Sequence, residues 1–362
     1  MEKELFALLR LGLGNTTAGE ENLSDFIMLS TGQWARIGEL AQEQGVLGVM
    51  LDGIDRLEET GYGTTRQLSK YLKIKWIGNV LQGYENRNQS QLAVIDILQK
   101  KWAEADLRMM VMKGQAMGSY YPISKHRCPG DIDCYLFDDF TKGNEVAKSF
   151  ADNVDEHWYK HSVISYKGES IENHQFFVHT RDGKRSKSLN QVLVDSLENQ
   201  DYQLLPGTEA LLPPPMFNAL FLTYHALAHF LEEGLRLKQI LDWAMFLKKD
   251  ADRVDWKEFY RLAEHFHLKR FAEVVTDIAV NYLGVQLSNE QIVSSSSYTQ
   301  KVIESTLYDK EYVFSSGESG WANRLHIVTN LFKYRWKYHD IYQSSVMRQV
   351  WFFVIGFLFK TE

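Results

Sequence analysis

The stretch that decides the fold reads MMVMKGQAMGSYYPISKHRCPGDIDCYLF and occupies residues 109–137. It begins with a short apolar run that stops at Lys113, and it ends with a second apolar run that starts at Asp131. Short apolar runs bounded by glycine and proline are typical of buried strands. We therefore expect strands at 109–113 and 132–136, adjacent in one small sheet.

Two further segments are expected to extend this sheet. Residues 158–166 and 170–180 have the composition of strands, and Asp182-Gly183 is a hairpin-turn signal. Together with a helix expected at 144–150, they define a module that spans residues 108–212.

The chain on both sides of the module has helical periodicity. Residues 1–107 form an N-terminal helical region, and three prolines at 213–215 open a C-terminal helical region that runs to residue 362. The second region is expected to contain helices at 217–231 and 236–249 and one from Trp256, capped by Asp255. The predicted fold class is α+β, a small mixed sheet flanked by helical regions.

Composition excludes several classes of protein. The chain has 362 residues, a formal net charge of −7 and 44% hydrophobic residues, so it has material for large cores and lacks the basic field of a dedicated nucleic-acid binder. Two cysteines, Cys128 and Cys134, are too few for a disulfide framework or a cysteine-rich zinc site. We expect reduced thiols and a cytoplasmic protein.

No segment approaches the length of a membrane span. The nearest, VWFFVIGFLF at 350–359, has ten residues and is expected to form a buried terminal helix, with a membrane or partner contact as the alternative.

Two carboxylates carry the clearest chemical signal. Asp131 and Asp133 alternate along the second predicted strand, so they share a face about 7 Å apart, while Ile132, Cys134 and Leu136 point into a core. Two carboxylates held this close repel each other unless a cation or a proton intervenes, and carboxylate oxygens suit Mg²⁺. Removing either one is expected to stabilise the metal-free protein. The alternative is a pair of exposed carboxylates on an edge strand.

The surrounding residues extend this signal into a recognisable pattern. The chain resembles the uncharacterised bacterial nucleotidyltransferases of the DNA polymerase β-like superfamily. The resemblance rests on Lys113-Gly114, Tyr121-Pro122, Arg127, Gly130-Asp131-Ile132-Asp133 and Glu172-Asn173-His174, with His225, Gly234, Arg236 and Leu241-Asp242-Trp243 in the helical region. The sequence departs from the family pattern at Cys128-Pro129, where the proline is displaced by one position.

The resemblance implies a transferase that moves a nucleoside monophosphate from an NTP to an acceptor of unknown identity. Asp131, Asp133 and Glu172 would hold two Mg²⁺ or Mn²⁺ ions, as two-metal phosphoryl chemistry requires. Lys113, Gly114 and Arg127 would bind the nucleotide phosphates, and His174, His225, Arg236 and Asp242 would support the site or line its cleft. The acceptor is open, with nucleic acid and protein among the candidates.

Several assignments stay open at this level. Gly118-Ser119 competes with Gly114 for the phosphate loop, and Asp195 competes with Glu172 as third carboxylate. Arg127 has the alternative of pairing with Asp131 or Asp133.

Two clusters lie outside this pattern. His225 and His229, four residues apart on a helix, fit a cleft wall between the module and helix 217–231, or a zinc pair that lacks a third ligand. Arg181, Lys184, Arg185 and Lys187 fit a solvated hairpin or the rim of a site for an anionic acceptor.

Overall fold

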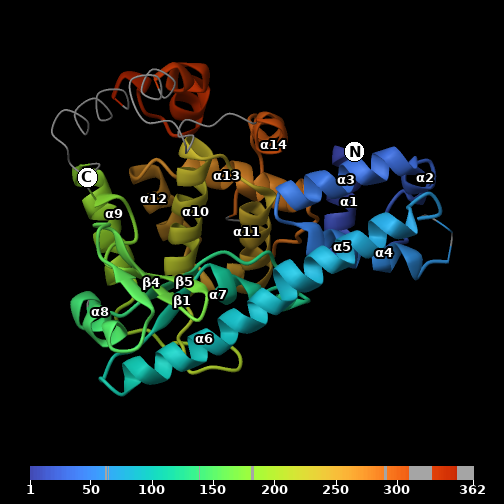
Figure 1. Ribbon diagram of the computed structural model, residues 1–362. Coiled ribbons are helices and arrows are strands. Elements are labelled where there is room, and N and C mark those ends of the chain that lie inside the picture. Colours follow the sequence, from blue (N-terminus) through green and yellow to red (C-terminus); the bar gives the residue numbers. More distant parts are fainter. Residues whose placement is uncertain are drawn as a thin grey trace.

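The computed structural model describes residues 1–61, 63, 65–137, 139–180, 183–288, 292–309 and 328–348 (Figure 1). The helix expected at 350–359 lies outside these residues, as do Asp138, Arg181 and Asp182.

The N-terminal region is helical, as predicted. Helix α3 begins at a capping box in which Ser30 accepts from the backbone N–H of Gln33 while the Gln33 side chain accepts from the backbone N–H of Ser30. The helices of this region are α1 (Glu2–Gly12), α2 (Leu23–Ile27), α3 (Thr31–Glu43), α4 (Leu47–Glu58), α5 (Lys70–Val80), the π-helical segment η1 (Leu81–Glu85) and α6 (Asn86–Ala103).

Among the described residues, the strands form one five-stranded mixed sheet in the order β1-β2-β5-β4-β3. Strand β2 is antiparallel to β1 and parallel to β5, and the other pairs are antiparallel. The strands are β1 (Met110–Met112), β2 (Ile132–Tyr135), β3 (Asn153–Asp155), β4 (His161–Tyr166) and β5 (Glu169–His174). The helices of this part of the chain are α7 (Gly114–Gly118), the 3₁₀ turn η2 (Ser124–His126) and α8 (Phe140–Lys148). The adjacent strands expected at 109–113 and 132–136 are confirmed.

The two faces of the sheet have different partners. Ile132, Cys134 and Leu136 enter a core with residues of α6 and α8, as expected from the alternation along β2. Tyr135 points to the opposite face and contacts Phe177, which in turn packs on Phe217 of α10. Figure 1 shows α6 below the sheet and α10 above it. Asp133 shares this second face, since it lies two residues before Tyr135.

The C-terminal region is also helical. Pro215 occupies the first turn of α10, where its missing N–H has no cost, and Asp255 accepts from the N–H of Glu258 to cap α12. Helix α9 (Lys184–Asp195) belongs to the module, before the three prolines. The helices of the C-terminal region are α10 (Pro215–Glu232), α11 (Leu237–Asp250), η4 (Ala251–Arg253), α12 (Trp256–His265), α13 (Lys269–Asp277), η5 (Ile278–Tyr282), α14 (Thr299–Tyr308) and η6 (Lys337–Ile341).

Three expectations for the sheet are wrong. Strand β4 starts at His161 rather than at 158, and β5 ends at His174 rather than at 180. The hairpin turn is Lys167-Gly168, where both residues have the positive φ that a type I′ turn needs. Gly183 instead precedes helix α9, so the described cations of the basic cluster, Lys184, Arg185 and Lys187, lie on a helix.

The helical regions do not form separate cores. Buried residues of α1, α3 and α4 belong to the same hydrophobic cluster as those of α10, α11 and α13. The side chain of Gln44, at the end of α3, accepts from the N–H of Leu237 and donates to the carbonyl of Thr306. The fold class is α+β, with a small mixed sheet between helical flanks, and no helix of the described residues is long and apolar enough to cross a membrane.

Candidate active site

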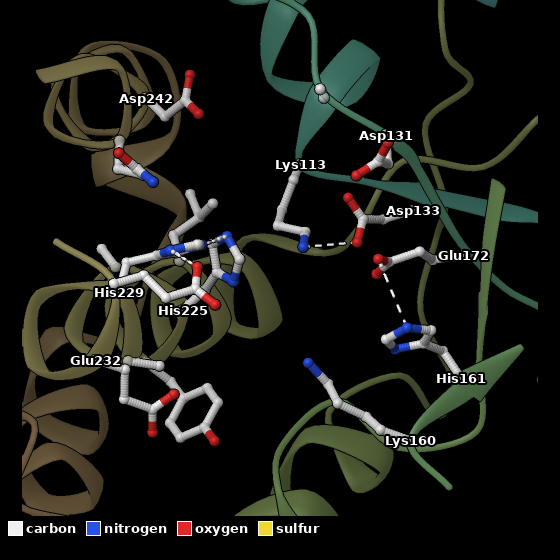
Figure 2. Close-up of a pocket in the computed structure, with 18 of the residues that line it drawn as sticks. Lys113, Asp131, Asp133, Lys160, His161, Glu172, His225, His229, Glu232 and Asp242 are labelled. Atoms are coloured by element: carbon white, nitrogen blue, oxygen red, sulfur yellow. Dashed lines mark hydrogen bonds and ion pairs between the residues drawn. The ribbon is translucent and has the colours of Figure 1, made fainter. Parts of the chain in front are cut away.

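Three carboxylates meet on one face of the sheet. Asp133 lies in β2, and its register partner in the parallel neighbour β5 is Glu172. Asp131 comes directly before β2. Figure 2 shows the three side chains on the same side, facing Lys113.

Asp133 is buried and has two partners. Lys113 Nζ lies 2.6 Å from its Oδ1, and His174 Nε2 lies 3.0 Å from the same atom. Burial alone would raise the pKa of Asp133, but the charge of Lys113 and the hydrogen bond from His174 outweigh it and hold the pKa well below its ordinary value. Asp133 is therefore ionised in the folded protein.

Asp131 is in a different environment. It is exposed, and no ion pair or hydrogen bond of its carboxylate is seen within the part of the chain that the structure describes. Partial desolvation raises the pKa of Asp131, and repulsion from Glu172 and Asp133 raises it further. Of the three carboxyl groups, Asp131 is thus the one whose pKa is raised by the repulsion expected between neighbouring carboxylates.

Glu172 is flanked by two imidazoles. His174 Nε2 lies 3.3 Å from Glu172 Oε2, and His161 Nε2 of β4 lies 3.6 Å from Oε1. Burial would raise the pKa of Glu172, but the hydrogen bond from His174 contributes to lowering it below its ordinary value. Among the described residues, one ligand atom from each of His161, Glu172 and His174 lies within 4.8 Å of the others.

The turn after β1 brings backbone to the site. Lys113 has φ of +47° and Gly114 of +20°, and a Cβ at Gly114 would lie 3.3 Å from the carbonyl oxygen of Asp131. A non-glycine residue in this region of backbone conformation is strained and is often found at functional sites. Gly114 lines the pocket, whereas the alternative pair, Gly118-Ser119, lies inside and after α7, with Ser119 donating to the carbonyl of Ala116.

Arg127 has a buried partner that the sequence did not indicate. Its Nε and Nη2 donate to Asp242 of α11 at 2.8 and 2.7 Å, and Tyr121 donates to the same carboxylate at 2.8 Å. Nη1 donates to the carbonyl of Cys128. The partners considered from the sequence, Asp131 and Asp133, are not the ones observed, and Asp242 supports the loop that leads to Asp131.

Helix α10 forms the opposite wall. His229 Nε2 lies 3.2 Å from His225 Nε2, and His229 Nδ1 lies 3.2 Å from a carboxylate oxygen of Glu233. Desolvation lowers the pKa of His225 well below its ordinary value, and the charges of Lys113 and His229 lower it further. The placement of His225 in the cleft wall agrees with the prediction, and Arg236, exposed at the start of α11, also lines the pocket.

These walls enclose a pocket of about 730 Å³, a size typical of small-molecule sites. The wall formed by residues 158–161 and by His179 was not predicted from the sequence. Lys160 points its amine into the pocket (Figure 2), and no ion pair of that amine is seen in the described part of the chain. The sequence could have placed His161 in the site, because a hairpin turn at Lys167-Gly168 pairs His161 with His174.

The donor set fits divalent cations. Asp131, Asp133 and Glu172 offer carboxylate oxygens to a hard ion, and an ion would relieve the repulsion at the carboxylate of Asp131, which has no partner among the described residues. Asp195, the alternative third carboxylate, ends helix α9 and accepts from Gln191, and it does not line this pocket.

The chain matches the model of a known protein family. A family model described as uncharacterised nucleotidyltransferase matches residues 30–284. No curated protein and no solved structure matches the chain.

Proposed function

The chain belongs to the uncharacterised nucleotidyltransferase family, and from this premise we propose that it transfers a nucleoside monophosphate from an NTP to a hydroxyl or phosphate acceptor in a reaction that depends on Mg²⁺ or Mn²⁺. The observation that carries the proposal is the convergence of Asp131, Asp133 and Glu172 on one pocket, with Lys113 beside them. The acceptor and the base of the NTP are left open.

Asp131, Asp133 and Glu172 would hold the metal, which when bound neutralises phosphate charge and lowers the pKa of an attacking hydroxyl. Lys113 Nζ, paired with Asp133, would shift part of its contact to a phosphate oxygen. The N–H groups that follow Lys113 would donate to phosphate oxygens, because Gly114 lines the pocket and allows their close approach.

Lys160 supplies a second cation for the phosphates. Burial lowers the pKa of Lys160 and the charge of Lys113 lowers it further, while Asp133 and Glu172 act in the opposite direction. A desolvated amine without an ion partner gains most from an anionic ligand. We therefore place the phosphates between Lys113 and Lys160.

The reaction balances with the groups present. The acceptor oxygen forms a bond to the α-phosphorus, the bond from that phosphorus to the oxygen bridging to the β-phosphate breaks, and pyrophosphate leaves. Glu172 would accept the proton of an acceptor hydroxyl, and His174, hydrogen-bonded to both Glu172 and Asp133, would keep the two carboxylates oriented. Helix α10 lines the side of the pocket that faces the carboxylates.

The alternative is a non-catalytic relative that binds a nucleotide or a partner. Equilibrium binding of a non-hydrolysable NTP tests whether the pocket binds a nucleotide together with a metal ion. We expect binding that requires Mg²⁺ or Mn²⁺ and that is lost in Asp131→Asn, while Lys142→Met, an exposed change on α8, leaves it intact. Metal-independent binding of equal strength in both variants would contradict the proposal. Binding without turnover of the natural NTPs would favour the alternative.

A further inference from the structure

The hairpin of β4 and β5 places two histidines beside the third carboxylate. The Lys167-Gly168 turn fixes the register so that His161 lies opposite His174 and Val163 lies opposite Glu172. Glu172 and His174 share a face because they are two residues apart on one strand. His161 reaches the same face from the adjacent strand, and all three lie within 4.8 Å of one another through one ligand atom each.

The separations are those of atoms that share a metal ion. Ligands held at about 2.0–2.1 Å around a tetrahedral ion lie about 3.3–3.4 Å apart. The observed distances are 3.3 Å from His174 Nε2 to Glu172 Oε2 and 3.6 Å from His161 Nε2 to Glu172 Oε1. Asp133 Oδ1, 3.0 Å from His174 Nε2, is next to the same position. The two distances run to different oxygens of Glu172, so side-chain rotation would be needed for one ion to contact all three residues.

The hydrogen bonding of His174 also suits a ligand. Its Nδ1 lies 3.2 Å from the carbonyl oxygen of Phe176, which only accepts, so Nδ1 carries a proton. Its other ring nitrogen, Nε2, faces the carboxylates, at 3.0 Å from Asp133 Oδ1 and 3.3 Å from Glu172 Oε2. Nε2 is therefore the atom that would bind a metal ion held between these residues. Ligating histidines typically donate their other N–H to a carbonyl in this way.

The donor set selects the kind of metal. Mg²⁺ prefers oxygen ligands in an octahedral arrangement, whereas imidazole nitrogens favour first-row transition metals. The other close pair in the pocket, His225 and His229, lacks a third ligand among the described residues.

We propose that His161, Glu172 and His174 bind one transition-metal ion, of the class of Co²⁺ or Zn²⁺, in preference to Mg²⁺ and before any nucleotide is bound. Asp133 would lie beside this ion, and Asp133 and Glu172 would be shared with the Mg²⁺ that enters with the NTP. The place of this ion in the reaction rests on the proposed function, but its binding does not. Because the Nδ1 of His161 has no hydrogen-bond partner among the described residues, we expect His161 to be the weaker of the two imidazole ligands.

The test titrates Co²⁺ into the full, nucleotide-free chain and follows its visible absorption, with excess Mg²⁺ as competitor. We expect one Co²⁺ per chain, a spectrum of nitrogen and oxygen ligation, and affinity at least tenfold above that for Mg²⁺. His174→Gln and Glu172→Gln are expected to lose at least tenfold in affinity, and His161→Gln somewhat less. The matched control is His157→Gln, an exposed histidine in the segment before β4.

The outcomes separate this inference from the proposed function. Because His174 is buried, the folding of His174→Gln is first checked by circular dichroism. If His174→Gln does not fold, the Co²⁺ affinity of His161→Gln decides the test. Equal binding of Co²⁺ by wild type and by folded His161→Gln, or displacement of Co²⁺ by equimolar Mg²⁺, would overturn the inference and leave the transferase proposal standing. Tight Co²⁺ binding by a chain that transfers no nucleotide would overturn only the transferase proposal.

Discussion

Asp133 and Glu172 are direct neighbours across the parallel strands β2 and β5. This register places a third carboxylate beside the Asp131–Asp133 pair, although the strand that carries it comes after α8, β3 and β4 in the chain. It also leaves the three carboxylates in unlike surroundings, because Lys113 and His174 bind Asp133 whereas Asp131 has no such partner among the described residues.

Asp131→Asn and Asp133→Asn are expected to change stability in opposite directions. The raised pKa of Asp131 means that its ionisation disfavours the folded state, so Asp131→Asn raises the melting temperature of the metal-free protein at pH 7. That gain disappears below about pH 4, where the carboxyl is protonated in the unfolded chain as well. Asp133→Asn leaves Lys113 without its buried partner and costs about 3 kcal/mol.

Thermal melts of both variants across pH check this. The sequence alone predicted stabilisation for either change, so a rise in melting temperature for Asp133→Asn would show that its ion pair contributes nothing.

The Arg127–Asp242 pair is expected to stabilise the fold. Asp242→Asn removes the charge that compensates a buried guanidinium and costs about 3–5 kcal/mol of unfolding free energy, measured by urea denaturation. The double variant Arg127→Met with Asp242→Leu is expected to recover much of this loss, since it removes both buried charges. If Asp242→Asn instead keeps full stability and weakens NTP binding, Arg127 is a phosphate ligand, as the sequence suggested.

Lys160→Met is expected to stabilise the folded protein and to weaken NTP binding. Replacing a largely buried amine that has no ion partner among the described residues with an apolar side chain of similar length raises the melting temperature. The same change weakens NTP binding by about tenfold, since one charge-assisted contact is worth about 1.5–3 kcal/mol. Lys142→Met, on the exposed face of α8, serves as the control for both measurements. Unchanged NTP affinity in Lys160→Met would place the phosphates elsewhere in the pocket.

His179 is expected to make the stability of the folded protein depend on pH. Burial, with the charges of Lys160 and His161, lowers the pKa of His179 to about 4, and its Nδ1 lies 3.0 Å from the hydroxyl of Tyr159. Between about pH 6.5 and 4 the unfolded chain binds a proton at this residue that the folded chain does not, so stability falls as the pH falls. His179→Gln removes this contribution, on the order of 1–2 kcal/mol at pH 5. The urea midpoints of the wild type and of His179→Gln at pH 7 and pH 5 measure this contribution. An equal fall of the midpoint in both proteins between pH 7 and pH 5 would contradict the prediction.

The sequence predicted the part of the site that lies on one strand. Alternation along β2 is a local property, so it correctly assigned Ile132 and Cys134 to a core and Asp133 to the other face. The third carboxylate followed from the Glu172-Asn173-His174 pattern, which the resemblance supplied.

Contacts between distant elements could not be predicted in the same way. The partner of Arg127 depends on how α11 packs against the loop before β2, and that packing is fixed by the shared core of the N-terminal and C-terminal helices. Helix α9 was missed because the Asp182-Gly183 turn signal outweighed the helical spacing of Leu189 and Leu193, which are both buried.

The most direct test of the transferase proposal uses the four NTPs, each labelled at the α-phosphate, with Mg²⁺ or Mn²⁺ and an extract that supplies acceptors. Mass analysis of the chain and of the extract detects the product, and a coupled assay detects pyrophosphate. We predict a nucleoside monophosphate adduct with stoichiometric pyrophosphate, dependent on metal and absent in Asp131→Asn and Glu172→Gln. No adduct with any NTP, or equal pyrophosphate release by the wild type and both variants, would contradict the proposal.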